Sequence, residues 1–267
     1  MYEQYYGLSE KPFNLTPDTE FFYQSVTHKE ALEVLLVALR SGDGFIKVTG
    51  EVGTGKTLIC RKLLDSLEAE FDTIYIPNPS MNSEALFGAI LSELGVESRD
   101  SREEPLTRIY NRLIENARSG RGTVILLDEA QAIPDESLEA VRLLSNLETS
   151  KKKLLQIVLF GQPELDIRLK RDCIRQLRQR IMHHYQLQPL NRESIGSYLQ
   201  HRISSAGYHG PALFDHAAQN RLFKFSQGIP RVINVLCNKA LMLSYASGDF
   251  YVSSKHIEAA AADSQLQ

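Results

Sequence analysis

The sequence predicts an α/β fold in which helices cover a five-stranded parallel sheet and a small all-α domain follows. Five short apolar runs alternate with helical stretches as far as residue 189. A glycine-rich loop joins the first of these runs to the helix behind it. After residue 189 the apolar runs stop and only helical stretches remain. Strands that alternate with helices form parallel sheets covered on both faces, which is why we predict this class.

The individual elements follow from local patterns along the chain. Residues 1–28 are rich in aromatic residues and prolines and are expected to be ordered but irregular. An amphipathic helix then begins at Thr27 or His28 and stops at Gly42. The predicted strands cover residues 45–49, 73–77, 123–128, 155–161 and 184–187. The predicted helices cover residues 57–69, 83–94, 106–118, 135–148, 163–180, 192–205, 214–226, 230–246 and 254–262.

These elements divide the chain into an N-terminal segment (1–28), an α/β core (29–189) and a helical domain, or lid (190–267).

Hydrophobic residues make up 43% and charged residues 24% of the chain, which excludes a disordered or fibrous protein. The net charge of −3 argues against a molecule built to coat nucleic acid.

Cysteine usage and hydropathy indicate the compartment. The 3 cysteines lie far apart without the spacing of metal ligands, which favours a reducing compartment. The sequence shows no secretory signal, and no apolar run approaches the roughly 20 residues that span a bilayer. We therefore expect a cytoplasmic protein without an integral membrane segment, recruited to any membrane at which it works.

The glycine-rich loop has the pattern of a phosphate-binding loop. Residues 50–57 read GEVGTGKT, between the first predicted strand and the next helix. In such loops backbone N–H groups point at phosphate oxygens and the helix N-terminus favours negative charge. Lys56 would reach the β- and γ-phosphates of ATP and Thr57 would hold Mg²⁺. The expected nucleotide contacts are Gly50, Glu51, Val52, Gly53, Thr54, Gly55, Lys56, Thr57 and Leu58.

Two carboxylates follow the third predicted strand. Residues 124–129 read VILLDE, so Asp128 and Glu129 stand at the end of a buried strand. Asp128 can hold the Mg²⁺ shell, and Glu129 can polarise the attacking water as a general base. A solvated acidic turn is the alternative, but behind a phosphate-binding loop the pair favours ATP hydrolysis.

A phosphate-binding loop, an acidic strand end, a further strand and a helical lid together resemble the AAA+ ATPases. The resemblance implies that Asn78 closes the second strand and regulates Glu129, although Asn-Pro is also a common turn dipeptide. It implies that Gln162, after the fourth strand, senses the γ-phosphate. Gln162 is longer than the usual Asn, Ser or Thr, and a turn before Pro163 is the alternative.

Arginines near the last strand and in the lid match two further features of that family. Residues 168–180 carry six basic residues against one acidic residue. The resemblance implies an arginine finger that reaches the ATP of a neighbouring subunit, with Arg180 as first choice and Arg178 as second. A solvated helix face and phosphate contacts to DNA are the alternatives.

Pro230 and Arg231 begin a lid helix and resemble the sensor 2 motif, where the arginine contacts the γ-phosphate. A plain helix start is the alternative.

The N-terminal segment narrows the resemblance to the ExeA family, which is associated with bacterial secretion and type IV pili. The matching stretches are YGLSEKPF (6–13), LTPD (15–18), HKEAL (28–32), DEAQ (128–131) and FGQPEL (160–165). The resemblance implies that Phe13 and its neighbours line the adenine side of the site. The run 44–64 is most similar to the family branch that serves the mannose-sensitive haemagglutinin (MSHA) pilus.

The resemblance implies an ATPase that self-associates through its ATP site and works with inner-membrane pilus or secretion proteins. We expect no direct binding of peptidoglycan, because the given sequence shows neither the transmembrane helix nor the peptidoglycan-binding domain that the resemblance associates with ExeA. Two other functions stay open: a DNA-associated regulator resembling transposition ATPases, and a slow ATP-dependent docking switch.

Overall fold

A computed structural model describes residues 2–16, 18–96, 103–149 and 152–264 of the protein. The chain forms two compact units. The sheet unit comprises His28–Gly50 and Ile59–Leu187, and the helical unit comprises Met1–Thr27, Glu51–Leu58 and Gln188–Gln267.

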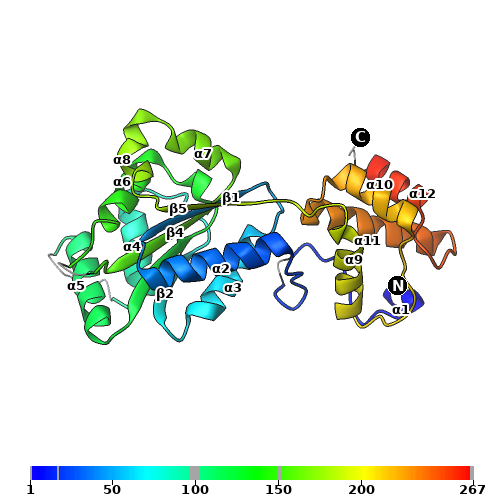
Figure 1. Ribbon diagram of the computed structural model, residues 1–267, viewed down its shortest axis with the longest axis horizontal. Coiled ribbons are helices and arrows are strands. Elements are labelled where there is room, and N and C mark those ends of the chain that lie inside the picture. The colour runs from blue at the N-terminus through cyan, green and yellow to red at the C-terminus, as the bar shows by residue number, and fades with distance from the viewer. Residues whose placement is uncertain (1, 17, 97–102, 150–151, 265–267) are drawn as a thin grey trace. The chain divides into compact units, whose positions relative to one another are not determined.

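The sheet unit is built on one parallel sheet with the strand order β2-β3-β4-β1-β5 (Figure 1). The strands are β1 (Phe45–Gly50), β2 (Phe71–Ile76), β3 (Gly122–Leu127), β4 (Leu155–Gly161) and β5 (His183–Leu187). Every pairing between neighbouring strands is parallel. The predicted α/β class with five strands is therefore confirmed, and each strand lies within two residues of its expected position.

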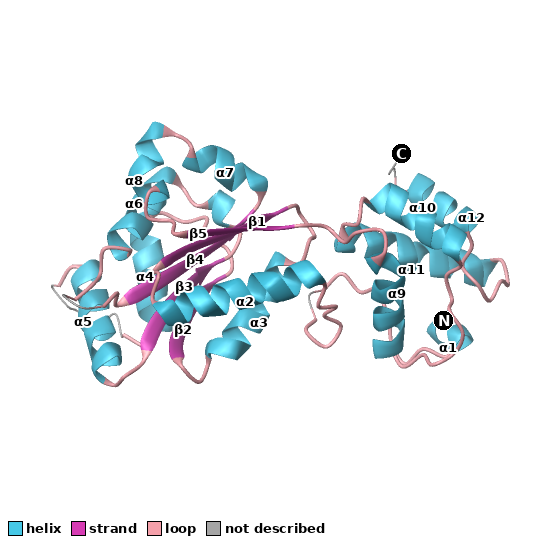
Figure 2. Ribbon diagram, in the orientation of Figure 1, coloured by secondary structure: helices cyan, strands magenta, loops and turns pink. Residues whose placement is uncertain are grey.

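Helices cover both faces of this sheet (Figure 2). One face carries α4 (Ser83–Glu93), α5 (Pro105–Arg118), α6 (Asp135–Leu144), α7 (Pro163–Leu169) and α8 (Arg175–Arg178), which share one apolar cluster with the strands. The other face carries α2 (Val26–Ser41) and α3 (Lys56–Leu67).

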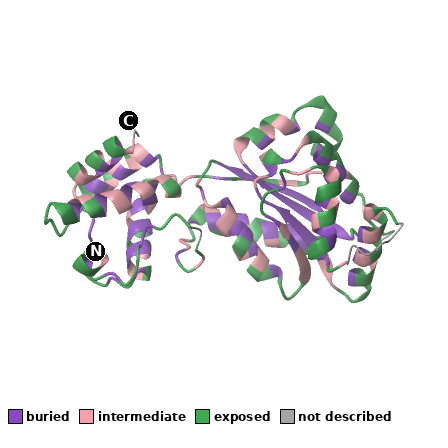
Figure 3. Ribbon diagram, turned by 180° about the vertical axis from the view of Figure 1, so that it is seen from behind, coloured by how far each residue is buried: buried purple, intermediate pink, exposed green. Residues whose placement is uncertain are grey.

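The strands in the middle of the sheet explain the apolar runs of the sequence. All residues of β1 and β4 are buried, whereas most residues of the edge strands β2 and β5 are partly or fully exposed (Figure 3). A strand buried on both faces needs apolar residues at every position rather than at every second one. Gln156 is the polar exception in β4, and its amide donates to the Leu39 carbonyl of α2 at 2.8 Å.

Two expected helices differ from the structure. The single helix predicted over 163–180 is wrong: α7 ends at Leu169, a 3₁₀ turn (Asp172–Ile174) follows, and α8 is a separate short helix. Arg171 is extended, with φ −66° and ψ 143°, so that the chain bends and buries Ile174 and Leu177. The helix expected over 135–148 ends as α6 at Leu144, because an antiparallel bridge between Glu148 and Lys153 follows it.

The helical unit contains α9 (Ser194–Ser205), α10 (His216–Ser226), α11 (Pro230–Ala246) and α12 (Ser254–Asp263). The sequence predicted these helices, but it missed the short α1 (Tyr2–Tyr6) in the N-terminal segment. None of the helices in the described parts of the chain is both long and apolar enough to cross a bilayer.

The N-terminal segment is part of the helical unit's core. Tyr6, Phe13 and Phe21 are at most 4% exposed and pack within its apolar cluster. The buried guanidinium of Arg202 on α9 donates to the carbonyl oxygens of Pro12 at 2.6 Å and Phe21 at 3.3 Å. Because these carbonyls would otherwise be buried without partners, Arg202 fixes the irregular segment to the helices.

Gly228 shapes the turn that leads into α11. It has φ +76°, and a Cβ atom placed on it would lie 1.9 Å from the carbonyl oxygen of Leu190. Its own carbonyl accepts from the backbone N–H of Leu190 at 2.9 Å. Only glycine allows both the positive φ and this close approach.

We expect Gly228→Ala to destabilise the protein far more than Gly248→Ala. Gly248 also has a positive φ of +74°, but a Cβ atom placed on it would have no atom within 4 Å. The left-handed backbone alone costs roughly 1–2 kcal/mol, and the clash at Gly228 should bring the total above about 3 kcal/mol. Urea unfolding of both variants measures the difference, and equal losses would contradict the proposed role of the close approach.

Candidate functional site

The glycine-rich loop connects β1, which ends at Gly50, to α3, which begins at Lys56. Gly53 and Gly55 have φ values of 84° and 100°, which residues with a Cβ rarely adopt. The carbonyl oxygen of Glu51 accepts hydrogen bonds from the Thr54 hydroxyl at 2.8 Å and from Nζ of Lys56 at 2.9 Å. The predicted strand–loop–helix arrangement is thus present, with the lysine only 5% exposed.

The first turn of α11 lies directly against this loop. The backbone N–H of Arg231 donates to the carbonyl of Gly53 at 3.2 Å. A Cβ on Gly53 would lie 2.4 Å from the Cβ of Arg231 and 3.3 Å from Ile229, so this close approach requires glycine. Pro230 is the first residue of α11, and the side chain of Arg231 is exposed. The structure therefore brings together two features that lie more than 170 residues apart in the sequence.

Asp128 lies at the end of β3, where it is buried to 2% exposure. Its backbone N–H donates to the Ile76 carbonyl at 3.0 Å, which extends the pairing with β2 by one residue. Its Oδ1 accepts from the N–H of Glu129 at 2.9 Å, and the Tyr75 hydroxyl lies 3.5 Å from its Oδ2. Burial and, after it, the charges of Cys60 and Asp128 raise the pKa of Tyr75.

Glu129 and Gln162 meet at the ends of β3 and β4. The side-chain amide of Gln162 donates to Oε2 of Glu129 at 3.0 Å, and Gln131 donates to the same oxygen at 2.5 Å. The backbone N–H of Gln162 donates in turn to Oε1 of Gln131 at 3.0 Å. Glu129 has φ 51°, a left-handed conformation that is uncommon for residues other than glycine.

Gln131 is a site residue to which the sequence motifs assigned no role. It lies in the 3₁₀ turn Ala130–Ala132, two residues after Glu129. The only signal for it was its place in the DEAQ stretch.

Asn78 lies beyond the end of β2 and is exposed. Its Oδ1 accepts from the backbone N–H of Ser80 at 3.3 Å, which is the kind of local turn that the Asn-Pro dipeptide also predicts. A regulatory role for Asn78 therefore stays a prediction.

The basic residues of the stretch 168–180, called here the basic strip, are partly neutralised by carboxylates of the sheet unit. Arg168 and Arg171 form ion pairs with Asp135 at 2.6 and 2.8 Å, and these arginines lower the pKa of its carboxyl. Arg178 is exposed, and its side chain has no hydrogen bond or ion pair with the described residues. Arg180 is half-buried and, after Lys153, contributes to the lowered pKa of Glu148. The choice of finger stays a prediction.

The family resemblance implies that Phe13 lies beside the adenine. Its ring is 2% exposed and contacts the edge of Phe214, with 5.9 Å between the centroids. The position is part of the core of the helical unit, and a contact with nucleotide stays a prediction.

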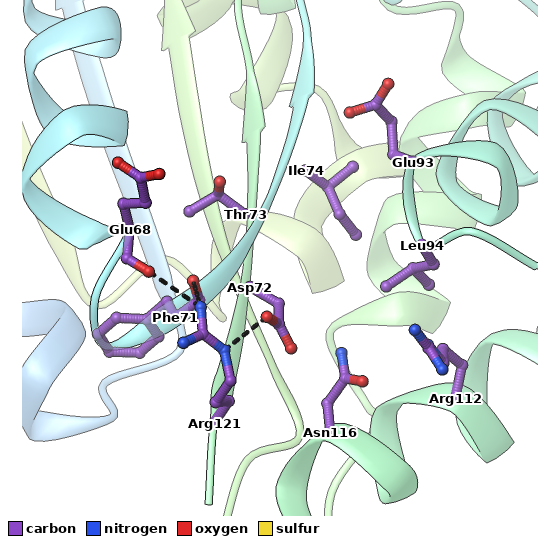
Figure 4. Close-up of a pocket in the computed structure, with 10 residues that line it drawn as sticks. All are labelled: Glu68, Phe71, Asp72, Thr73, Ile74, Glu93, Leu94, Arg112, Asn116 and Arg121. Atoms are coloured by element: carbon purple, nitrogen blue, oxygen red, sulfur yellow. Dashed lines mark hydrogen bonds and ion pairs between the residues drawn. The ribbon is translucent and has the colours of Figure 1, made fainter. Parts of the chain in front are cut away.

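A pocket of about 280 Å³ lies at the other end of the sheet, beside the amino-terminal ends of β2 and β3 (Figure 4). There Arg121 donates to Asp72 at 2.7 Å and to the carbonyl oxygens of Phe71 at 2.7 Å and Glu68 at 3.0 Å. Because the strands are parallel, this pocket is at the opposite edge from Asp128 and Glu129. We regard Arg121 as a structural tie between the α3–β2 turn and β3.

The residues predicted to hold magnesium each carry an oxygen donor of the kind that Mg²⁺ binds. Within the described ranges no three His, Cys, Asp or Glu side chains are grouped so that they could hold a metal ion by themselves. Mg²⁺ does not need such a group, because it is usually bound by one or two protein oxygens together with phosphate oxygens and water. The Asp128 carboxylate and the Thr57 hydroxyl are donors of this kind.

The protein is similar to known proteins in its sequence and in its fold. Residues 39–169 match a family model described as an AAA domain. The chain is 42% identical over 263 residues to General secretion pathway protein A of Aeromonas hydrophila. This match covers 98% of the chain but 48% of that protein, so the chain spans about half the length of its relative. The two comparisons therefore support an AAA domain over residues 39–169 and the ExeA-family resemblance.

Solved structures show the same fold at low sequence identity. Cdc6p from Pyrobaculum aerophilum has a TM-score of 0.67 and 16% identity, covering 93% of this chain and 71% of its own. Drosophila ORC bound to DNA has a TM-score of 0.71 and 18% identity, and the match covers 97% of this chain and 65% of the ORC chain. RuvB from Thermotoga maritima, a Holliday junction branch migration motor, has a TM-score of 0.62 and 15% identity. The match covers 91% of this chain and 72% of the RuvB chain. The AAA-type fold, a five-stranded parallel sheet with a helical C-terminal part, is therefore established.

Proposed function

We propose that the protein is a Mg²⁺-dependent ATPase that hydrolyses ATP to ADP and phosphate. The observation that carries the proposal is the carboxylate of Glu129, held at the end of β3 by two glutamine amides. A carboxylate oriented in this way can accept a proton from a water molecule. The AAA domain match over residues 39–169 supports ATP as the substrate.

Each residue then has a role that follows from its chemistry. The glycine-rich loop and Lys56 bind the phosphates, and Glu129 takes the proton of the attacking water. Thr57 and Asp128 would hold Mg²⁺, which neutralises charge that develops on the phosphate oxygens. Gln162 and Arg231 are proposed to contact the γ-phosphate, and Arg180 or Arg178 to act on the site of a neighbouring subunit.

We expect Lys56→Ala to lose nucleotide binding and turnover, and Glu129→Gln to bind ATP but hydrolyse it slowly. Removing a general base typically costs about 10²–10⁴-fold in rate. Phosphate release and binding of a fluorescent ATP analogue measure the two effects. Lys62→Ala, a lysine of α3 outside the loop, is the matched control and should retain both. A Glu129→Gln variant with wild-type turnover would contradict the assignment.

We expect Arg231→Ala to raise the KM for ATP or to lower kcat. Loss of a hydrogen bond to a charged group should reduce kcat/KM by about 10- to 100-fold. Arg221→Ala removes an arginine of the same unit that pairs with Glu258, and it should leave the kinetics unchanged. Unaltered steady-state kinetics in Arg231→Ala would exclude its contact with the γ-phosphate.

In the cell, we propose that the ATPase assists assembly of a secretion complex or of a type IV pilus. The pilus would be of the MSHA type, which the family member MshM serves. This step rests on the similarity to General secretion pathway protein A and on the family resemblance. We propose a cytoplasmic protein with the segments 1–28, 29–189 and 190–267 as its functional parts. It would assemble into an oligomer through its ATP sites and be recruited to the inner membrane.

A crosslinked pull-down with ATP-loaded Glu129→Gln tests this role, since the slow variant should keep the ATP-bound form. We expect inner-membrane pilus or secretion proteins among the captured partners, and fewer of them with Lys56→Ala. Recovery of nucleic acid or transposition proteins instead would contradict the assembly role. The pairing of Arg168 and Arg171 with Asp135 leaves fewer charges in the basic strip for DNA phosphates.

A further inference from the structure

One side chain, Gln131, connects the two residues that the sequence predicted to act on the γ-phosphate and the water. Its Nε2 donates to Oε2 of Glu129, and its Oε1 accepts from the backbone N–H of Gln162. The same Oε2 also accepts from the side-chain amide of Gln162 at 3.0 Å. The three residues therefore form a closed ring of hydrogen bonds.

The ring determines how the carboxylate of Glu129 is presented. Both amide donors bind Oε2, and among the described residues no donor reaches Oε1. A carboxylate has about four acceptor positions, so Oε1 keeps its capacity to accept a proton from water. Glu129 lies at a left-handed φ of 51°, and such a backbone persists where the surrounding structure fixes it.

Gln131 is itself held in place by a second contact. Arg168 of α7 donates from one guanidinium nitrogen to the Gln131 carbonyl at 2.5 Å and from another to Asp135 at 2.6 Å. The 3₁₀ turn is closed by the Ala132 N–H, which donates to the Glu129 carbonyl at 2.8 Å. Gln131 thus has a fixed backbone, and the two bonds of its amide define which end is oxygen and which is nitrogen.

We propose that Gln131 is a positioning residue that orients the Glu129 carboxylate and couples it to Gln162. The inference rests on the proposed ATPase function and assigns a role within that same site. A movement of Gln162 at the end of β4 would reach the general base by two routes, through the Gln131 amide and through the direct bond from the Gln162 side chain. Gln131 does not act on the water or the phosphate itself.

The test uses Gln131→Ala and the isosteric Gln131→Glu in the full chain. Gln131→Glu keeps the acceptor for Gln162 but places a like charge beside Glu129, so it should be at least as damaging as Gln131→Ala. Loss of a hydrogen bond to a charged group should lower kcat by roughly 10- to 100-fold while KM and nucleotide affinity stay near wild type. Gln200→Ala, at an exposed glutamine of α9, is the control and should have wild-type kinetics.

Coupling to Gln162 gives a second kinetic readout. Because Gln131 also bonds the backbone of Gln162, the double variant Gln131→Ala, Gln162→Ala should cost less than the product of the two single losses. Independent effects that multiply would overturn the coupling.

Nuclear magnetic resonance of the nucleotide-free protein tests the ring without catalysis. The side-chain amide signals of Gln131 and Gln162 should both shift in Glu129→Ala, and unchanged signals would overturn the ring. A wild-type protein without ATPase activity would overturn the proposed function. An active wild type, an inactive Glu129→Gln and a fully active Gln131→Ala would overturn the inference alone.

Discussion

The parallel pairing of β3, β4 and β1 is the constraint on which the candidate site depends. In a parallel sheet the carboxyl ends of all strands lie at one edge, and ligands of such folds bind there. Asp128, Gln162 and the start of the glycine-rich loop each follow the last residue of a strand. The strands are parallel and are connected through helices. Polar residues that lie far apart in the sequence therefore come to the same edge of the sheet.

The same constraint explains what the sequence could predict. Strands buried on both faces need continuous apolar runs, and such runs revealed all five strands. The break in the helix expected over 163–180 could not be read in the same way. It depends on Arg171 bonding Asp135 and on Ile174 and Leu177 packing near α6, which are contacts between distant parts of the chain.

The candidate site was predictable to a similar degree. Motifs that require particular residue types at a fixed spacing identified the glycine-rich loop and Glu129. Gln131 escaped because its role depends on the direction of an amide in a 3₁₀ turn, and that direction follows from its two hydrogen bonds to Glu129 and Gln162. Phe13 shows the opposite difficulty, since an aromatic residue that packs in a core has the same sequence pattern as one that contacts a ligand.

Every role proposed for these residues requires that the protein binds ATP with magnesium and hydrolyses it. A single-turnover assay, with protein in excess over ATP, follows the formation of ADP and phosphate over time. We predict complete, Mg²⁺-dependent conversion of the bound ATP, which stops when the metal is chelated. Recovery of bound ATP intact after prolonged incubation with Mg²⁺ would refute hydrolysis and leave a protein that binds nucleotide without turning it over.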